Sequence, residues 1–209
     1  ASTDIDVIVD LGGLNGNKLV LLKEQGISFR KGYVIDLNPL PIFSQLGIEY
    51  LKCDLNKDKM PFIDGSVDIV LMLDVIEHLE NTDHILEEAY RILKSGGLLI
   101  LTTPNLAWYP NIVLLIAGFQ PFFTEVSYKR IFGRPGKDVQ GHLRVFTYRS
   151  IREMLTYYGF KIKIMRSFSS PHLFRNYRAS GAFYLLDKLM SMILPHLGPI
   201  ILVVAIKAA

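Results

Sequence analysis

Four polar or glycine-rich segments in the first hundred residues each follow a short apolar run, and their order constrains the fold more than any other feature. They are the glycine loop at 12–16, Asp36, Asp54 and the segment DVIEHL at 74–79. The apolar runs are typical of buried strands, and ligands of open parallel sheets bind at the edge where the carboxyl ends of the strands meet. The order therefore predicts a nucleoside-binding pocket at that edge.

Helix-like segments alternate with the apolar runs at the spacing of βαβ units, which indicates a parallel sheet with helices on both faces. The expected strands are residues 5–11, 32–35, 49–52, 67–73, 98–103, 161–165 and 200–206. The expected helices are residues 17–25, a segment from Pro39 or Pro41 to Gly47, and residues 82–94 and 148–158. We therefore predict a doubly wound, seven-stranded α/β fold in which residues 1–209 form a single domain.

The alternation stops between Pro104 and Gly141, where prolines and aromatic residues interrupt every periodic pattern. A connection of this length is uncommon in a compact domain, so we predict that residues 105–141 form an insertion, or cap, that recognises a substrate. Its aromatic residues suit an apolar or ring-bearing acceptor, although they could equally form a small core of their own. They include Trp108, Tyr109, Phe119, Phe122, Phe123 and Tyr128.

The small net charge of +3 conceals two oppositely charged parts of the chain. Residues 1–104 hold 9 Lys and Arg against 16 Asp and Glu, whereas residues 105–180 hold 12 against 3. The basic part is either an ordinary solvated face or a surface that attracts an acidic substrate, nucleic acid or anionic lipid.

Cysteine usage and the amino-terminal residues predict a cytoplasmic protein. The one cysteine, Cys53, excludes an internal disulfide framework, and the first residues lack the basic and apolar pattern of a secretory leader. Two apolar stretches do not change this expectation. Residues 111–123 are too short to span a membrane, and residues 181–209 are interrupted by charged residues and a proline.

The glycine loop and the first aspartate fit a nucleoside ligand. Gly12, Gly13 and Gly16 let the backbone approach a ligand closely, since glycine has no side chain and tolerates positive φ. Asp36 lies 20 residues after Gly16, where an acid can accept hydrogen bonds from ribose hydroxyls. A dinucleotide site, or a tight turn with a capping aspartate, would use the same residues.

Asp54 favours an adenosyl ligand over a dinucleotide. A carboxylate after the third strand can accept a hydrogen bond from an adenine amino group, while the backbone amide of Leu55 meets the ring. A dinucleotide oxidoreductase remains the weaker alternative, because the loop lacks the middle glycine of that fingerprint and Asp54 would have no role.

Taken together, these segments resemble class I S-adenosylmethionine-dependent methyltransferases, in particular the small-molecule group related to quinone-biosynthesis O-methyltransferases. The resemblance implies S-adenosylmethionine as cofactor and a mostly parallel sheet with one reversed strand near the end. It also implies that Asp10 and Gly12 face the methionine part and that Leu73 and Asp74 form the far wall. The matching segments are IVDLGGLNG, VIDLNP, CDLNKDKMPFIDGSVDIVLMLDVIEHL, ILKSGGLLILTTPN and GHLRVFTYRSIREMLTYYGF.

The chain departs from the family pattern in two ways. It has Leu14 where relatives usually have glycine, and it begins at the first strand, whereas relatives usually carry one or two helices before that strand. A leucine in the loop either points away from the ligand or narrows the pocket. If it blocks the cofactor, the chain would be a non-catalytic binding module whose basic and apolar insertion meets a partner or a membrane surface.

Two histidines are candidates for the base that accepts a proton from an acceptor hydroxyl, because imidazole titrates near neutral pH. His78 lies just beyond the cofactor edge, and His142 lies where the chain returns from the insertion. In some quinone O-methyltransferases a Glu-His pair at this place takes part in binding a divalent metal, and Glu77 with His78 matches that pair. A polar helix cap explains the pair equally well, and we assign no metal ligand from the sequence.

The acceptor predicted from these features is a small molecule, either lipophilic or anionic, and a peripheral contact with lipid is compatible with the insertion. Nucleic acid is disfavoured, because LDVIEH lacks the acid-Pro-Pro-aromatic pattern of base amine methylation. Cys53 lies on the adenine side, where it could not act as the nucleophile of base C5 methylation. The sequence leaves the atom methylated and the oligomeric state open.

Overall fold

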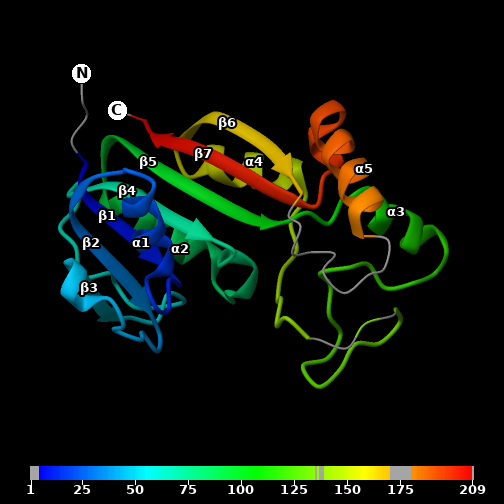
Figure 1. Cartoon of the computed structure of the whole chain (residues 1–209), viewed down its shortest axis with the longest axis horizontal. Coiled ribbons are helices and arrows are strands. Elements are labelled where there is room, and N and C mark those ends of the chain that lie inside the picture. The colour runs from blue at the N-terminus through cyan, green and yellow to red at the C-terminus, as the bar shows by residue number, and fades with distance from the viewer. Residues whose placement is uncertain (1–4, 135, 137–138, 170–179, 209) are drawn as a thin grey trace.

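The computed structural model of the chain describes residues 5–134, 136, 139–169 and 180–208. Seven strands form one sheet in the order β3-β2-β1-β4-β5-β7-β6 (Figure 1). The strands are β1 (Ile5–Leu11), β2 (Phe29–Asp36), β3 (Ile48–Lys52), β4 (Val67–Leu73), β5 (Leu93–Pro104), β6 (Phe160–Phe168) and β7 (Ile200–Lys207). The helices are α1 (Asn17–Glu24), α2 (Thr82–Ile92), α3 (Tyr109–Ile116), α4 (Tyr148–Tyr157) and α5 (Ser180–Ile193), with the 3-10 turns η1 (Ser44–Leu46), η2 (Ile76–His78) and η4 (Pro195–Leu197).

Strands β1 to β5 run parallel, and β7 runs antiparallel to both of its neighbours, β5 and β6. The predicted doubly wound, mostly parallel sheet with one reversed strand near the end is therefore confirmed. Strands β2 and β3 lie on one side of β1, and β4 and β5 lie on its other side. The carboxyl ends of β2, β1 and β4 therefore meet at the switch point where such sheets bind ligands.

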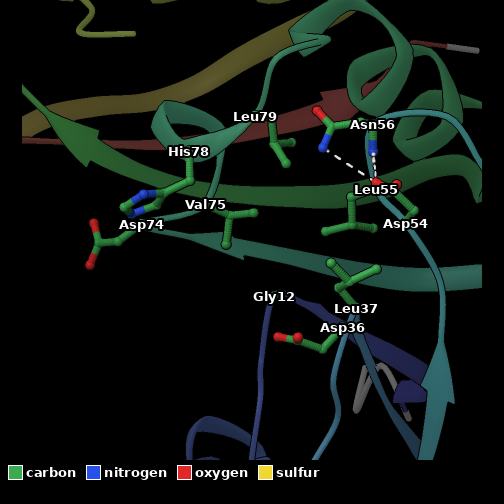
Figure 2. Close-up of a pocket in the computed structure, with 10 residues that line it drawn as sticks. All are labelled: Gly12, Asp36, Leu37, Asp54, Leu55, Asn56, Asp74, Val75, His78 and Leu79. Carbon is green, nitrogen blue, oxygen red and sulfur yellow. Dashed lines mark hydrogen bonds between the residues drawn. The ribbon is translucent and has the colours of Figure 1, made fainter. Parts of the chain in front are cut away.

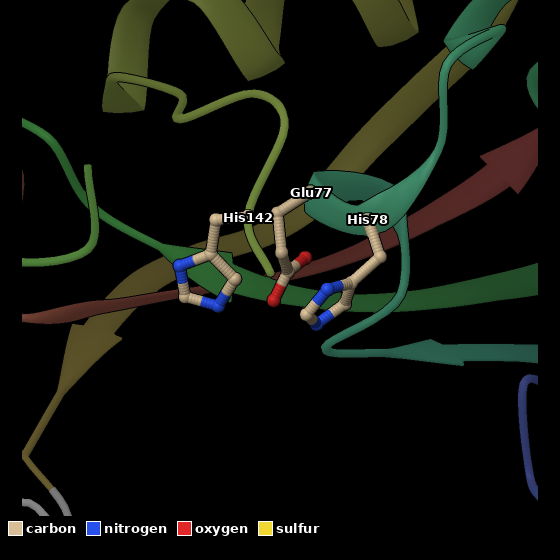
Figure 3. A group of neighbouring side chains, drawn as sticks. All are labelled: Glu77, His78 and His142. Atoms are coloured by element: carbon tan, nitrogen blue, oxygen red, sulfur yellow. The ribbon is translucent and has the colours of Figure 1, made fainter. Parts of the chain in front are cut away.

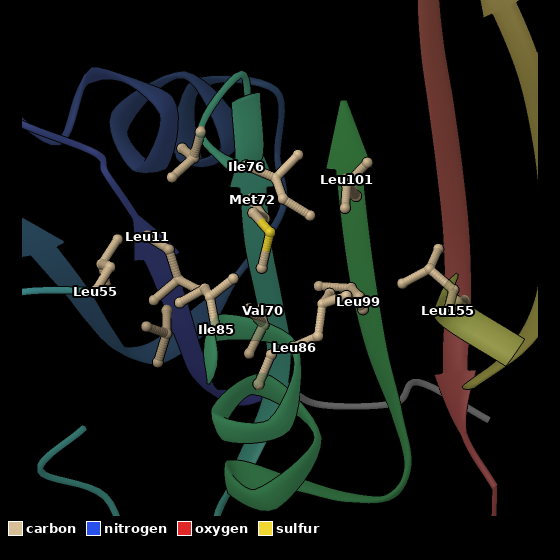
Figure 4. Close-up of a cluster of buried hydrophobic side chains, with 14 of the residues drawn as sticks. Leu11, Leu55, Val70, Met72, Ile76, Ile85, Leu86, Leu99, Leu101 and Leu155 are labelled. Atoms are coloured by element: carbon tan, nitrogen blue, oxygen red, sulfur yellow. The ribbon is translucent and has the colours of Figure 1, made fainter. Parts of the chain in front are cut away.

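Two apolar layers hold the sheet between its helices. On one face, β-strand residues such as Met72 and Leu101 pack against Ile85 and Leu86 of α2 and Leu155 of α4 (Figure 4). On the other face, a smaller cluster joins α1 to alternate residues of the same strands. It contains Ile8, Leu19, Phe29, Val34, Ile48 and Leu71.

The prediction of a helix from Pro39 or Pro41 to Gly47 is wrong, because only the short turn η1 forms there. The backbone amide of Leu40 donates to the carbonyl of Leu14 at 2.8 Å, so this segment is held against the glycine loop. This contact with the glycine loop takes the place of the helix start that the prolines suggested. A smaller difference is that α2 ends at Ile92 and β5 begins at Leu93, earlier than expected.

The segment between β5 and α4 contains α3, which the sequence did not reveal. Trp108 and Phe123 are buried there and form a separate small aromatic cluster. The indole Nε1 of Trp108 donates to the carboxylate of Asp187 on α5 at 2.9 Å. This bond explains why α5, another helix absent from the sequence prediction, packs beside α3 (Figure 1). Within the described residues, every helix is too short or too polar to cross a membrane.

Replacement of a fully buried isoleucine of α2 tests the main apolar layer. We expect Ile85→Ala to lower the free energy of unfolding by about 2 to 4 kcal/mol, because the lost contacts leave a cavity. The matched control is Ile63→Ala at a side chain that is 82% exposed, which should change stability by less than about 0.5 kcal/mol. Urea denaturation of both variants measures the difference, and equal losses would contradict the packing described.

Candidate functional site

A pocket of about 320 Å³ opens at the carboxyl ends of β1, β2 and β4 (Figure 2). Aspartates from three successive connections line it, and apolar side chains form its other walls. The lining residues are Gly12, Asp36, Leu37, Asp54, Leu55, Asn56, Asp74, Val75, His78 and Leu79. The volume lies within the range of small-molecule sites, so one ligand of moderate size fits at this edge.

The glycine loop forms the floor of the pocket through close backbone packing. Gly12 has a φ of +62°, and a Cβ atom there would lie 2.7 Å from Cγ2 of Val75. Its amide donates to the carbonyl of Ile35 at 2.7 Å, which ties the loop to the end of β2. A side chain at Gly12 would therefore strain the backbone and displace the pocket wall.

Asp10 lies buried beneath this loop with no side-chain hydrogen bond. Neither carboxylate oxygen has a hydrogen-bond partner among the described residues, and the Nζ of Lys18 lies 3.9 Å from Oδ1. Burial raises the pKa of Asp10 to about 6, with Lys18 opposing the rise and Asp36 adding to it. Buried polar groups without partners are rare, so this carboxylate is suited to receive a cationic group of a ligand.

Asp36 holds the loop in place and keeps its carboxylate at the pocket. Its Oδ2 accepts from the amide of Leu14 at 3.2 Å, and its Oδ1 accepts from the amide of Asn38 at 2.9 Å. Leu14 adopts a positive φ of 45°, its side chain is 44% exposed, and it is not among the residues that line the pocket. The leucine therefore supplies a backbone contact to Asp36 while its side chain leaves the pocket open.

Asp54 and Asn56 shape the opposite end of the pocket. The Oδ1 of Asp54 accepts from the amide and the side-chain nitrogen of Asn56, and these hydrogen bonds, with Lys57 nearby, lower the pKa of Asp54. The Oδ1 of Asn56 in turn accepts from the amides of Glu80 and Asn81 at 2.7 and 3.1 Å. Asn56 thus joins the loop after β3 to the segment after β4.

The nine residues predicted to hold a cofactor do not all reach the pocket wall. The structure places Gly12, Asp36, Asp54, Leu55 and Asp74 on the wall. Four others lie outside it: Asp10, Gly13, Gly16 and Leu73. Of these, Asp10 and Gly13 are packed together, since a Cβ at Gly13 would lie 2.3 Å from Oδ2 of Asp10. The carbonyl of Leu73 accepts from the Nζ of Lys18 at 2.9 Å.

Sequence reasoning missed four residues of the wall: Leu37, Asn56, Val75 and Leu79. Leu37 and Val75 directly follow the predicted residues Asp36 and Asp74, so the strand ends already indicated them. Asn56 likewise follows the predicted residue Leu55, but its contacts could not be foreseen, because they are made with amides that lie 24 and 25 residues further along the chain.

Beside the pocket, Glu77, His78 and His142 come together although they lie on two separate segments (Figure 3). The ring centroids of the two histidines are 4.9 Å apart. The chain returning from the insertion is fixed there by its backbone, since the amides of Leu143 and Arg144 donate to the carbonyl of Glu77 at 2.8 and 3.1 Å. His78 also lines the pocket, so this cluster and the pocket share a wall.

Glu77 and His142 are both buried, which changes their acid-base behaviour. Burial raises the pKa of Glu77 to about 7, with the charge of Asp74 adding to the rise and a hydrogen bond from Thr103 opposing it. Burial lowers the pKa of His142, and its Nδ1 lies 2.9 Å from the carbonyl of Phe123. At neutral pH His142 is therefore an uncharged imidazole that donates from Nδ1 and leaves Nε2 as an acceptor.

The other described histidines, His84 and His196, are not members of this cluster. The Nε2 of His84 contacts the carbonyl of Asp58 at 3.0 Å, and His196 is an exposed residue of η4. His172 lies outside the described residues.

Residues 9–101 match the family model described as a methyltransferase domain. The chain is similar to a probable S-adenosylmethionine-dependent methyltransferase of Mycolicibacterium smegmatis, with 40% identity over 24% of this chain and 20% of that protein. It is also similar to the ubiquinone/menaquinone biosynthesis C-methyltransferase UbiE of Stenotrophomonas maltophilia, with 31% identity over 44% of this chain and 40% of that protein.

The fold extends the likeness over the whole chain. A solved structure of a putative methyltransferase from Bacillus halodurans superposes with a TM-score of 0.66 at 20% identity, covering 100% of this chain and 95% of that one. The chain spans less than half the length of the two curated relatives above. Residues 9–101 match a methyltransferase domain, and the sheet order and the pocket edge agree with the S-adenosylmethionine-dependent enzymes to which this part of the chain is similar.

Proposed function

We propose that the protein transfers a methyl group from S-adenosylmethionine to a small, lipophilic acceptor that carries an acidic hydroxyl. One observation carries the proposal. The pocket that presents Asp36 and Asp54 shares the wall at His78 with a partly buried cluster able to remove a proton. The cofactor supplies an activated methyl group on a positively charged sulfur.

The residues present fit this cofactor. Asp36 and Asp54 offer carboxylate oxygens at two places on the pocket wall, suited to a ribose and an adenine amino group. Asp10 offers two buried oxygens without partners near the glycine loop, suited to the ammonium of the methionine part. The backbone at Gly12 supports close approach, because it adopts a positive φ and carries no side chain.

The acceptor would be activated by the cluster of Glu77, His78 and His142. The uncharged Nε2 of His142 can take the proton of a hydroxyl, and the neighbouring Glu77 carboxyl then stabilises the positive ring. A deprotonated phenol or enol is nucleophilic at oxygen and at the adjacent carbon, so the same activation serves either site of methylation. Holding the acceptor against the sulfonium carbon supplies the remaining acceleration.

The surroundings of His142 favour an apolar acceptor. The ring centroid of Phe123 lies 6.3 Å from that of His142, and the ring centroids of Trp108 and Phe123 are 5.7 Å apart. Further out, α3 exposes apolar side chains and contains no charged residue, with Val113 63% and Ile116 84% exposed. A lipid-like molecule could reach the cluster along these surfaces with little desolvation cost.

Leu14 provides a direct test of the cofactor site. The leucine side chain lies outside the pocket, so we expect Leu14→Gly to change the dissociation constant of S-adenosylhomocysteine by less than about threefold. Isothermal titration calorimetry measures it. Absence of binding to the natural chain at millimolar ligand, with binding restored by the glycine, would instead establish a blocked, non-catalytic relative.

The buried carboxyl of Asp10 predicts a pH dependence of cofactor affinity. Because its pKa is raised to about 6, the carboxyl is ionised at pH 7.5 and mostly protonated at pH 5. Only the ionised form attracts the ammonium, so affinity for S-adenosylhomocysteine should fall about tenfold between these pH values. Titrations of Asp10→Asn should show weaker binding at pH 7.5 and a flat profile. An unchanged slope would assign the dependence to another group.

The base proposed for the acceptor can be separated from the cofactor site. We expect His142→Gln to lower the turnover number by about 10² to 10⁴, since general base catalysis has that magnitude. Affinity for S-adenosylhomocysteine should stay within about threefold, because His142 does not line the pocket. Transfer of a labelled methyl group to a panel of quinols and phenols gives the rates. His84→Gln is the matched control and should retain full activity.

A further inference from the structure

We propose that Lys18 binds the carboxylate of an amino-acid group on the ligand, and that it thereby selects the intact cofactor over analogues that lack this carboxylate. The inference rests on the proposed function and adds a binding residue to it. Lys18 is the second residue of α1, just after the glycine loop. Its Nζ donates to the carbonyl of Leu73 at 2.9 Å and lies 3.9 Å from Oδ1 of Asp10.

These contacts place the Lys18 ammonium beside the part of the pocket that Gly12 and Asp74 form. Leu73 directly precedes Asp74, and Asp10 lies two residues before Gly12. Both Gly12 and Asp74 line the pocket (Figure 2). The side chain of Lys18 is 36% exposed, so it is open to contact from outside the core. A ligand that fills the pocket and extends past Gly12 and Asp74 therefore meets this ammonium.

Pairing with Asp10 alone does not account for Lys18. At 3.9 Å the two groups are too far apart for a hydrogen bond, and neither carboxylate oxygen of Asp10 has a hydrogen-bond partner among the described residues. An ammonium has three hydrogens to donate. In the part of the chain that the structure describes, the carbonyl of Leu73 is the one hydrogen-bond acceptor of Lys18. Lys18 therefore keeps donors for a ligand.

The charges around the pocket explain why an anionic group of the ligand needs Lys18. Asp74 lines the pocket and Asp10 lies beneath the glycine loop, so a carboxylate that entered here without a cation would be repelled. The cation beside Asp54, Lys57 at 3.3 Å, belongs to the opposite end of the pocket. Near the glycine loop, positive charge comes from Lys18 and from the amino-terminal end of α1, whose first turn contains no acidic residue.

Asp10 and Lys18 together offer opposite charges at the spacing of an α-amino acid, in which an ammonium and a carboxylate are attached to the same carbon. The ammonium of the ligand would lie against Asp10, and its carboxylate would accept a charge-assisted hydrogen bond from Lys18. S-adenosylmethionine carries such a group at the end remote from its adenine. The pair would therefore recognise the methionine part, in addition to the ribose and the adenine.

The binding of two ligands to two forms of the full chain tests the contact. S-adenosylhomocysteine has the carboxylate, whereas its decarboxylated analogue keeps the ammonium, the ribose and the adenine. We expect the natural chain to bind S-adenosylhomocysteine about tenfold more tightly than the analogue, since a hydrogen bond between charged groups has about that effect. Lys18→Met should remove this preference. Isothermal titration calorimetry measures the four dissociation constants.

The ratio of the two affinities isolates the carboxylate contact. Both ligands carry the ammonium, so an effect of the substitution on Asp10 cancels in the ratio. Lys18→Arg keeps the positive charge and should keep most of the preference. Lys23→Met is the matched control, because Lys23 lies on the same helix and its Nζ donates to the carbonyl of Leu46, which does not line the pocket. This control should bind both ligands as the natural chain does.

Three results would overturn the role of Lys18. The first is equal affinity of the natural chain for the two ligands, and the second is a preference that persists in Lys18→Met. The third is tighter binding of S-adenosylhomocysteine by Lys18→Met, because Lys18 would then compete with the ligand for the carbonyl of Leu73. Binding of both ligands without preference refutes this role and leaves the proposed function in place. If neither ligand binds the natural chain, the proposed function itself fails.

Discussion

Parallel pairing of β2, β1 and β4 is the constraint on which the rest of the structure depends. Because these strands run in the same direction, their carboxyl ends meet at one edge, and Gly12, Asp36 and Asp74 are brought to a single pocket. The apolar layers on both faces fix the strand register, and a slip of one residue would turn every one of these side chains to the wrong face. The position of the pocket is therefore a consequence of core packing.

A second set of backbone contacts joins the segment that carries His142 to this edge. The return segment at 141–144 pairs with the carbonyl of Glu77 and places His142 beside His78, a separation of 64 residues along the chain. The carbonyls that orient the two imidazoles come from the insertion and its return. Residues 105–141 thus orient both imidazoles of the cluster.

Backbone strain is concentrated at the site. Among the described residues, Leu14, Asp74 and Phe123 are the non-glycine residues with positive φ, at 45°, 57° and 69°. Each has a part in the arrangement: Leu14 donates to Asp36, Asp74 lines the pocket, and Phe123 offers its carbonyl to His142. Such conformations cost about 1 to 3 kcal/mol each and persist where the surrounding structure fixes them. The apolar layers supply that support.

The sequence by itself determined the α/β alternation, the strand ends and the acids that follow them, because apolar periodicity and glycine placement are local signals. It did not reveal α3, α5 or the contacts of Asn56, and it predicted a helix after Pro39 where the segment instead binds the glycine loop. It indicated His78 and His142 as two separate candidates for a base. Only the tertiary structure decided that these histidines meet around a buried glutamate and that the side chain of Leu14 leaves the pocket open, because both outcomes depend on hydrogen bonds between residues far apart in the chain.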